Sequence, residues 1–278
     1  MDDTAKALVL GFLGLIVVHA GLERRARHDA ARQLDGAFHH SGALRLSVEP
    51  RGMLGALGNR LYAIDVTGTG QSIDKMPFAS IPRSGWKGEI RHLRVHLDSL
   101  TLKGLPVERL DADIPNVTYD IGQALYKDRL VIRGAGEGPA TVRIGADGLR
   151  RFIDRKYGQT VTDVAVAFRG GRVQITGDLM FLGAKAPFVA LGDMTTRSGR
   201  YVDLAQADVT LNGKPLSPDL VQAIIRQLNP LLDIADDLGL AGYLKLTSVS
   251  VGADAVTVYA TATIPVLSTP SLGPGSGH

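Results

Sequence analysis

The 278-residue chain contains no cysteine, which excludes disulfide bonds, thiolate metal sites and cysteine nucleophiles. Aromatic residues make up only 5% of the sequence, so the core must be built from leucine, valine, isoleucine and alanine. The net charge of +3 is small for this length, whereas nucleic-acid binding uses concentrated basic stripes with stacking aromatic residues. We therefore expect an aliphatic interior and no nucleic-acid partner.

Residues 7–18, "ALVLGFLGLIVV", form an uninterrupted apolar run. It is short for a bilayer span, which needs about 20 residues, and has the length of the apolar region of an export signal. Val18-His19-Ala20 fits a small-x-small cleavage site, although acidic residues before the run are unusual for such signals. We expect residues 1–21 to be a cleaved signal peptide or a retained signal-anchor, with a buried or surface helix as the alternative. The predicted location is extracytoplasmic and membrane-associated, in the cell envelope or periplasmic space.

Residues 22–38 have helical apolar spacing, and a basic group lies along this predicted helix: Arg24, Arg25, Arg27 and Arg32. Arginines directly after a membrane-directed segment can contact anionic lipid headgroups, at about 1 kcal/mol per charge near the surface. The two interpretations are membrane headgroup contact and an ordinary solvated helix face.

Most of the remaining chain alternates apolar and polar residues with a period of two, as in residues 93–98 and 255–264. Similar runs occupy residues 44–48, 62–66, 110–121, 129–133, 139–145, 161–168, 172–181, 186–191, 201–211 and 243–251. Such strands have one apolar and one solvated face, which favours an antiparallel sheet.

Two internal helices interrupt the strands. The first is predicted over residues 147–157 with Asp147 as its N-cap. The second is capped by Ser217, has Pro218 in its first turn and ends at Asn229-Pro230. Because strands and helices do not alternate strictly, we predict an α+β fold in which a long curved antiparallel sheet wraps around one or two helices.

The segment "GAGEG" at residues 134–138 is the one stretch that looks like a phosphate-binding loop. Such loops need the start of a helix directly behind the glycines, to present backbone N–H groups to the phosphate. Here the period-two segment "ATVRI" follows instead, and the spacing is GxGxG rather than GxGxxG. We predict a hairpin turn between strands 129–133 and 139–145.

No catalytic constellation is recognised. "SIDK" at residues 72–75 matches the S-x-x-K pattern of serine acylases, but it lies in a predicted loop and lacks the companion motifs. The carboxylate pairs Asp111/Asp113 and Asp236/Asp237 have no evident acid–base partner. We assign no catalytic residue.

The histidines do not indicate a metal centre. His92 and His96 share the polar face of one predicted strand and stand about 13 Å apart, too far to bind one ion. His96 and Asp98 would supply only two ligands. We interpret these residues as a solvated strand face and expect neither a metal nor a cofactor.

Several segments together resemble the LmeA-like phospholipid-binding family of bacterial envelope proteins. These are "ALRLSVEPRGMLGALGNRLYAIDVTGTG", "LDSLTLKGLPVERLDADIPNVTYDIGQAL", "ATVRIGADGLRRFID", "VTLNGKPLSPDLVQAIIRQLNPL" and "LGLAGYLKLTSVSVGADAVTVYATA". The resemblance covers residues 22–266 and consists of apolar and glycine patterns rather than a catalytic signature. It implies a tubular lipid-binding-like fold, in which a curved antiparallel sheet wraps a long helix and leaves an apolar tunnel.

The resemblance implies a non-enzymatic protein that binds a phospholipid or another acyl lipid and works at the membrane surface, in lipid transfer or in lipid-linked envelope glycan synthesis. We expect residues 22–266 to form one lipid-binding domain and residues 267–278, rich in Gly, Pro and Ser, to be a disordered tail. Seven apolar residues of the two internal helices are candidates for the lining, with plain core packing as the alternative: Leu149, Phe152, Ile153, Val221, Ile224, Ile225 and Leu228. The alternative function is a structural or scaffolding envelope protein whose core is filled, and a hydrolase with an unrecognised site is a third.

Overall fold

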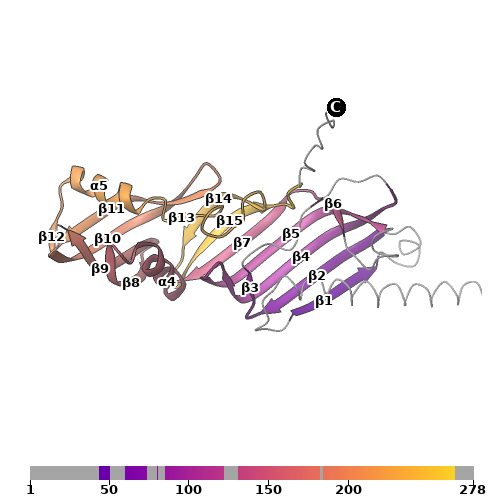
Figure 1. Cartoon of the computed structure of the whole chain (residues 1–278), viewed down its shortest axis with the longest axis horizontal. Helices are drawn as coiled ribbons and strands as arrows, with labels where there is room; N and C mark the ends of the chain where they lie inside the picture. The colour runs from indigo at the N-terminus through magenta and orange to yellow at the C-terminus, as the bar shows by residue number, and fades with distance from the viewer. Residues whose placement is uncertain are drawn as a thin grey trace, which may run out of the picture.

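Two sheets lie beside one another along the long axis of the molecule in the computed structural model, which describes residues 44–50, 60–73, 80, 85–121, 131–181 and 184–266 (Figure 1). Sheet A contains β1 (Leu44–Pro50), β2 (Arg60–Thr69), β3 (Ser72–Ile73), β4 (Lys87–Leu102), β5 (Leu105–Asp120), β6 (Ile132–Gly134), β7 (Gly138–Gly145), β14 (Leu244–Val251) and β15 (Ala255–Ala262). Sheet B contains β8 (Val161–Arg169), β9 (Arg172–Phe181), β10 (Ala184–Arg197), β11 (Tyr201–Leu211), β12 (Lys214–Pro215) and β13 (Leu232–Asp233). The helices are α4 (Ala146–Tyr157) and α5 (Pro218–Leu228).

The described part of the chain is mostly sheet with two helices, as an α+β fold requires. Sheet A runs in the order β1-β2-β4-β5-β7-β15-β14, and sheet B in the order β12-β11-β10-β9-β8. The prediction of an antiparallel sheet holds for most neighbours but is wrong for two: β2 and β3 both pair with β4 in parallel. β4 therefore begins beside the start of β2 rather than beside its end, an arrangement that alternation alone does not reveal.

Along β4, the alternation of buried and exposed residues shifts by one position at two places. Ile90 and Leu93 are both buried although they are three residues apart, and so are Leu97 and Leu100. Each change lies at a gap in the β4–β5 pairing, beside a residue with positive φ: Asn116 of β5 at the first gap and Ser99 of β4 at the second. Period two therefore describes the middle of this long strand, and local rotations of the backbone change which face the ends present to the core.

The "GAGEG" segment is not a hairpin turn, and this prediction is wrong. β6 and β7 both pair with β5, β6 near Thr118 and β7 between Arg109 and Ala112, so they follow one another along the same side of that strand. The break between them runs close to the β5 backbone, where the N–H of Gly136 donates to the carbonyl oxygen of Pro115 at 2.8 Å. The glycines allow this close approach of two backbones.

Both internal helices form as predicted, with a different start for the first. β7 continues directly into α4, so Gly145, which is extended, occupies the N-cap position that we assigned to Asp147. Asp147 lies in the first turn instead and forms ion pairs with Arg150 and Arg151, both at 2.8 Å. α5 begins after Ser217 with Pro218 in its first turn and ends at Asn229.

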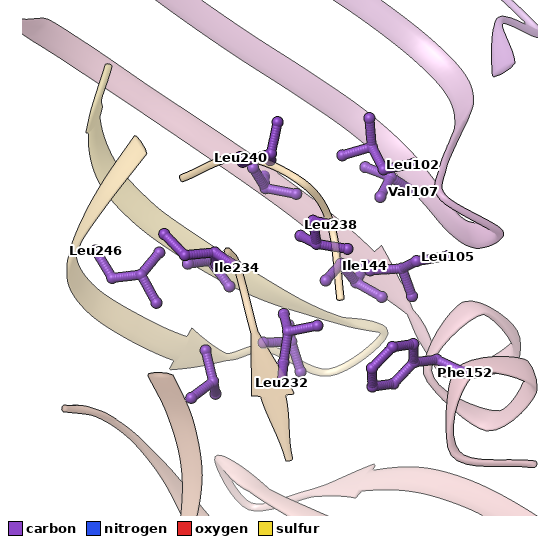
Figure 2. Packing of buried hydrophobic residues seen from close by; sticks show 14 of the residues in the cluster. Leu102, Leu105, Val107, Ile144, Phe152, Leu232, Ile234, Leu238, Leu240 and Leu246 are labelled. Atoms are coloured by element: carbon purple, nitrogen blue, oxygen red, sulfur yellow. The ribbon is translucent and has the colours of Figure 1, made fainter. Parts of the chain in front are cut away.

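One continuous apolar core extends across both sheets. Figure 2 shows its middle, where the segment between α5 and β14 places Leu232, Ile234, Leu238 and Leu240 among side chains of sheet A and Phe152 of α4. This segment and α4 therefore fill the space where the two sheets meet.

Candidate functional site

An apolar groove with a volume of about 580 Å³ lies between α5 and sheet B. Its lining comes from elements far apart in the sequence, including Val161 of β8, Leu179 of β9 and Leu211 of β11. The polar lining is limited to Tyr157, Thr160 and Gln227. A concave surface of this size and apolar character fits a small-molecule site.

One stripe of α5 faces the groove. It consists of Leu220, Ala223, Ile224, Gln227 and Leu228, the i, i+3, i+4, i+7 and i+8 positions of a helix face. A neighbouring stripe packs against the core and includes the buried Ile225 and the half-buried Val221. The helix therefore serves both as a wall of the groove and as part of the core of sheet B.

The lining of the groove is partly exposed and partly buried. Leu220 is 54% exposed and Met180 is 40% exposed. Val161, Leu179 and Leu228 are buried. The groove thus joins a dry apolar interior to the solvent.

Hydrogen bonds fix the C-terminus of α5, beside the buried Leu228. The Asn229 side chain accepts from the N–H of Leu204 at 2.8 Å and donates to its carbonyl oxygen at 2.9 Å. The Tyr157 hydroxyl lies 2.8 Å from the carbonyl oxygen of Leu228 and 2.9 Å from that of Pro230. Burial raises the pKa of Tyr157 well above its ordinary value, so the hydroxyl keeps the proton that it donates.

A charge cluster holds the segment that follows α5. Lys156 donates to Asp237 at 2.7 Å, and Arg200 donates to both carboxylate oxygens of Asp233 at 2.7 and 2.6 Å. Asp233 also accepts from the N–H of Ala235 at 2.9 Å. The Arg200 hydrogen bonds hold the pKa of Asp233 at about 2, below its ordinary value. Asp237 thus anchors this segment to α4, and no acid–base couple is evident.

We expect Asp233→Asn to lower the free energy of unfolding at neutral pH by about 2 kcal/mol, because Arg200 loses its carboxylate partner. The pKa of Asp233 is depressed in the folded state, so its charge stabilises the fold fully above the pKa of the unfolded chain. That contribution disappears as the pH falls from about 4 to about 2. Urea unfolding of both proteins across this window measures the difference, and a difference that stays constant down to the lower limit would contradict the assignment.

The outer face of sheet A carries a row of paired charges. His92 lies 3.0 Å from Asp113, Arg94 lies 3.4 Å from Asp65, and His96 contacts both Asp111 and Asp98. These side chains are partly exposed, in agreement with the predicted solvated strand face. Within the described ranges, no three His, Asp or Glu side chains are placed to hold one metal ion.

The structure separates the seven candidate lining residues into three groups. Ile224 and Leu228 line the groove, whereas Val221 and Ile225 lie on the neighbouring stripe of α5. The three candidates on α4 are buried in the core where the two sheets meet, outside the groove: Leu149, Phe152 and Ile153. Arg24, Arg25, Arg27 and Arg32 lie outside the described residues.

Sequence reasoning missed the residues that complete the groove. Ala223 and Gln227 were not recognised because only large aliphatic side chains were used to define the apolar face of α5. The face defined in this way is rotated about the helix axis relative to the face that lines the groove. Leu179 and Val161 come from strands whose position beneath α5 depends on sheet topology. Leu220 could have indicated the groove-facing side of α5, because its spacing of four residues from Ile224 can be read from the sequence.

A family model described as LmeA-like phospholipid-binding matches residues 85–261, which is well over half of the chain and includes every residue of the groove. Neither the curated proteins nor the solved structures contain a match. Among the described helices, none has the length and apolar character needed to cross a bilayer. Because the match covers well over half of the chain, this chain belongs to the LmeA-like phospholipid-binding family.

Proposed function

We propose that the protein is a non-enzymatic phospholipid-binding protein that holds an acyl chain in the groove between α5 and sheet B. The observation that carries the proposal is the groove itself, which has an apolar lining with both buried and solvent-exposed residues. Each buried CH₂ of an acyl chain contributes about 0.8 kcal/mol, so a chain along this lining needs no specific polar contact. The headgroup would remain beside the exposed part of the lining, in contact with water.

The family and the shape of the sheets support a wider proposal. We infer a tubular lipid-binding-like architecture formed by residues 22–266, preceded by the export segment 1–21 and followed by the tail 267–278. In this proposal the protein lies outside the cytoplasm at the membrane, with Arg24, Arg25, Arg27 and Arg32 contacting headgroups. Lipid transfer and lipid-linked envelope glycan synthesis are the two roles consistent with such a carrier.

A substitution that fills the groove tests the lipid-binding proposal. Ala223 is in the groove-facing stripe of α5, and its neighbour Gln222 is exposed and lies outside that stripe. Because a tryptophan at position 223 occupies the space of the acyl chain, we expect Ala223→Trp to reduce the phospholipid recovered per protein at least about fivefold. Gln222→Trp is the matched control and should leave recovery unchanged. Mass spectrometry of organic extracts from the purified full-length proteins makes the comparison.

The outcomes separate the candidate functions. Phospholipid in the unmodified protein and in Gln222→Trp, with loss in Ala223→Trp, supports a carrier that uses this groove. Equal recovery from all three proteins would place the lipid elsewhere. No phospholipid in any of them would favour the structural or scaffolding alternative, in which the protein carries no ligand.

A further inference from the structure

Three connections gather at the end of sheet B that is farthest from sheet A. β9 ends at Phe181 and β10 begins at Ala184, and these residues pair with one another. Phe188, near the start of β10, pairs with Leu211 at the end of β11, so the turn into β12 lies at the same end. α5 starts only a few residues later, and Figure 1 shows β12 and α5 at this extremity of the molecule. We call this region the groove end, defined by Met180, Lys185, Lys214 and Leu220.

The groove end exposes large apolar side chains. Leu220 and Met180 both line the groove and are among the exposed large hydrophobic residues of the described chain. Leu220 lies in the first turn of α5, ahead of the buried part of that helix. These side chains are therefore continuous with the apolar lining of the groove, and an apolar phase placed against them would extend that lining outward.

The groove end carries charges of both signs. The cations at this end are Lys185 and Lys214, and the carboxylates on the nearby ends of the same elements are Asp163, Asp178 and Asp219. Lys185 lies 3.4 Å from Asp163, and Asp219 lies in the first turn of α5, where the helix N-terminus favours a negative charge. A surface with exposed apolar side chains and charges of both signs, rather than a basic patch, complements a zwitterionic lipid surface.

We propose that the groove end docks on a phospholipid bilayer, with Leu220 and Met180 entering the boundary between headgroups and acyl chains. An acyl chain then moves from the bilayer into the groove without crossing water, because the two apolar regions are in contact. This inference rests on the proposed lipid-binding function and adds to it the surface through which lipid is exchanged. Because docking depends on apolar contact, we expect it to persist when the ionic strength is raised.

The opposite end of the molecule provides the competing docking surface and a native reporter. Trp86 is the only tryptophan in the chain and is 71% exposed. It directly precedes β4, at the end of the strands where Lys87 of β4 pairs with Asp120 of β5. β6 pairs with β5 close to that point. Figure 1 shows β6 at the end of the molecule away from α5. Trp86 therefore reports on the end that we expect to remain in water.

The test measures access of acrylamide, a water-soluble quencher, to single tryptophans in the full-length protein, with and without phosphatidylcholine vesicles. The three reporters are native Trp86, Lys185→Trp at the groove end and Tyr259→Trp on β15, the latter two combined with Trp86→Phe. Tyr259 is 42% exposed and serves as the control away from either end. Lys185 is outside the groove lining, so an acyl chain inside the groove does not shield a tryptophan at this position.

We expect vesicles to reduce quenching of the Lys185→Trp reporter at least about twofold and to leave Trp86 and the Tyr259→Trp reporter unchanged. Adding Leu220→Glu should restore quenching at position 185. Protection of Trp86 instead, protection at position 259, or no protection at position 185 would overturn the proposal. If phospholipid is recovered from the protein while position 185 stays accessible, the docking surface is wrong and lipid binding stands. If no lipid is recovered, the proposed function itself fails.

Discussion

Replacing Gly138 with alanine is expected to lower the free energy of unfolding by more than about 3 kcal/mol. An alanine Cβ at this position would lie 1.8 Å from the carbonyl oxygen of Asp113, which belongs to the backbone of β5. A backbone atom cannot move aside as a flexible side chain does, so β5 and β7 would have to separate. Because β7 also pairs with β15 along its whole length, the change would disturb the middle of sheet A.

Gly134→Ala is the matched control for this substitution. Gly134 belongs to the same glycine segment, but a Cβ there would meet only the hydroxyl oxygen of Thr118 at 3.4 Å, an ordinary contact. We expect it to change stability by less than about 1 kcal/mol. Chemical denaturation followed by circular dichroism compares the two variants with the unmodified protein. Equal stability of the two variants would contradict the close approach of β7 to β5.

Replacing Phe152 with alanine is expected to cost about 3–5 kcal/mol, the range for removing a large aromatic side chain from a packed core. Phe152 is 1% exposed and packs where α4, both sheets and the segment after α5 meet (Figure 2). The surrounding side chains are held by the two sheets and by the segment after α5, which the Lys156–Asp237 pair anchors to α4, so they cannot move far enough to fill the space. Val189→Ala, at a 37% exposed position of β10, should cost less than about 1 kcal/mol.

Phe152→Ala also tests whether the Phe152 side chain packs in the core or lines a lipid site. If this side chain belongs to the core, Phe152→Ala lowers stability while the folded protein still carries the phospholipid that Ala223→Trp loses. Denaturation midpoints and lipid recovery are measured on the same preparations. A Phe152→Ala protein of unchanged stability that has lost its lipid would instead place the ligand beneath α4.

The elements with strong local signals were predictable from the sequence. Ser217, Pro218 and the apolar spacing after them define α5, and the alternation of residues 255–264 matches β15. The family resemblance, carried by patterns in these same segments, is confirmed by the match over residues 85–261. These features depend on neighbours within about one turn of helix or a few strand residues, which is the range that periodicity samples.

Features that depend on strand topology were not predictable. The "GAGEG" glycines have the composition of a turn, and only the pairing of β6 and β7 with β5 shows that they allow two backbones to approach. Phe152 and Ile224 both lie on apolar helix faces, yet one is in the core and the other lines the groove. The difference comes from what α4 and α5 pack against, and single-sequence patterns carry no information on that.

Photochemical labelling tests most directly whether an acyl chain occupies the groove between α5 and sheet B. A phosphatidylcholine with a diazirine on one acyl chain is bound to the full-length protein and irradiated, and the labelled peptides are located by mass spectrometry. We expect labels on α5 and on the end of β9, near Ile224 and Leu179, and loss of both in Ala223→Trp. Labels confined to α4 around Leu149 and Phe152, or to the charged outer face of sheet A, would contradict the account.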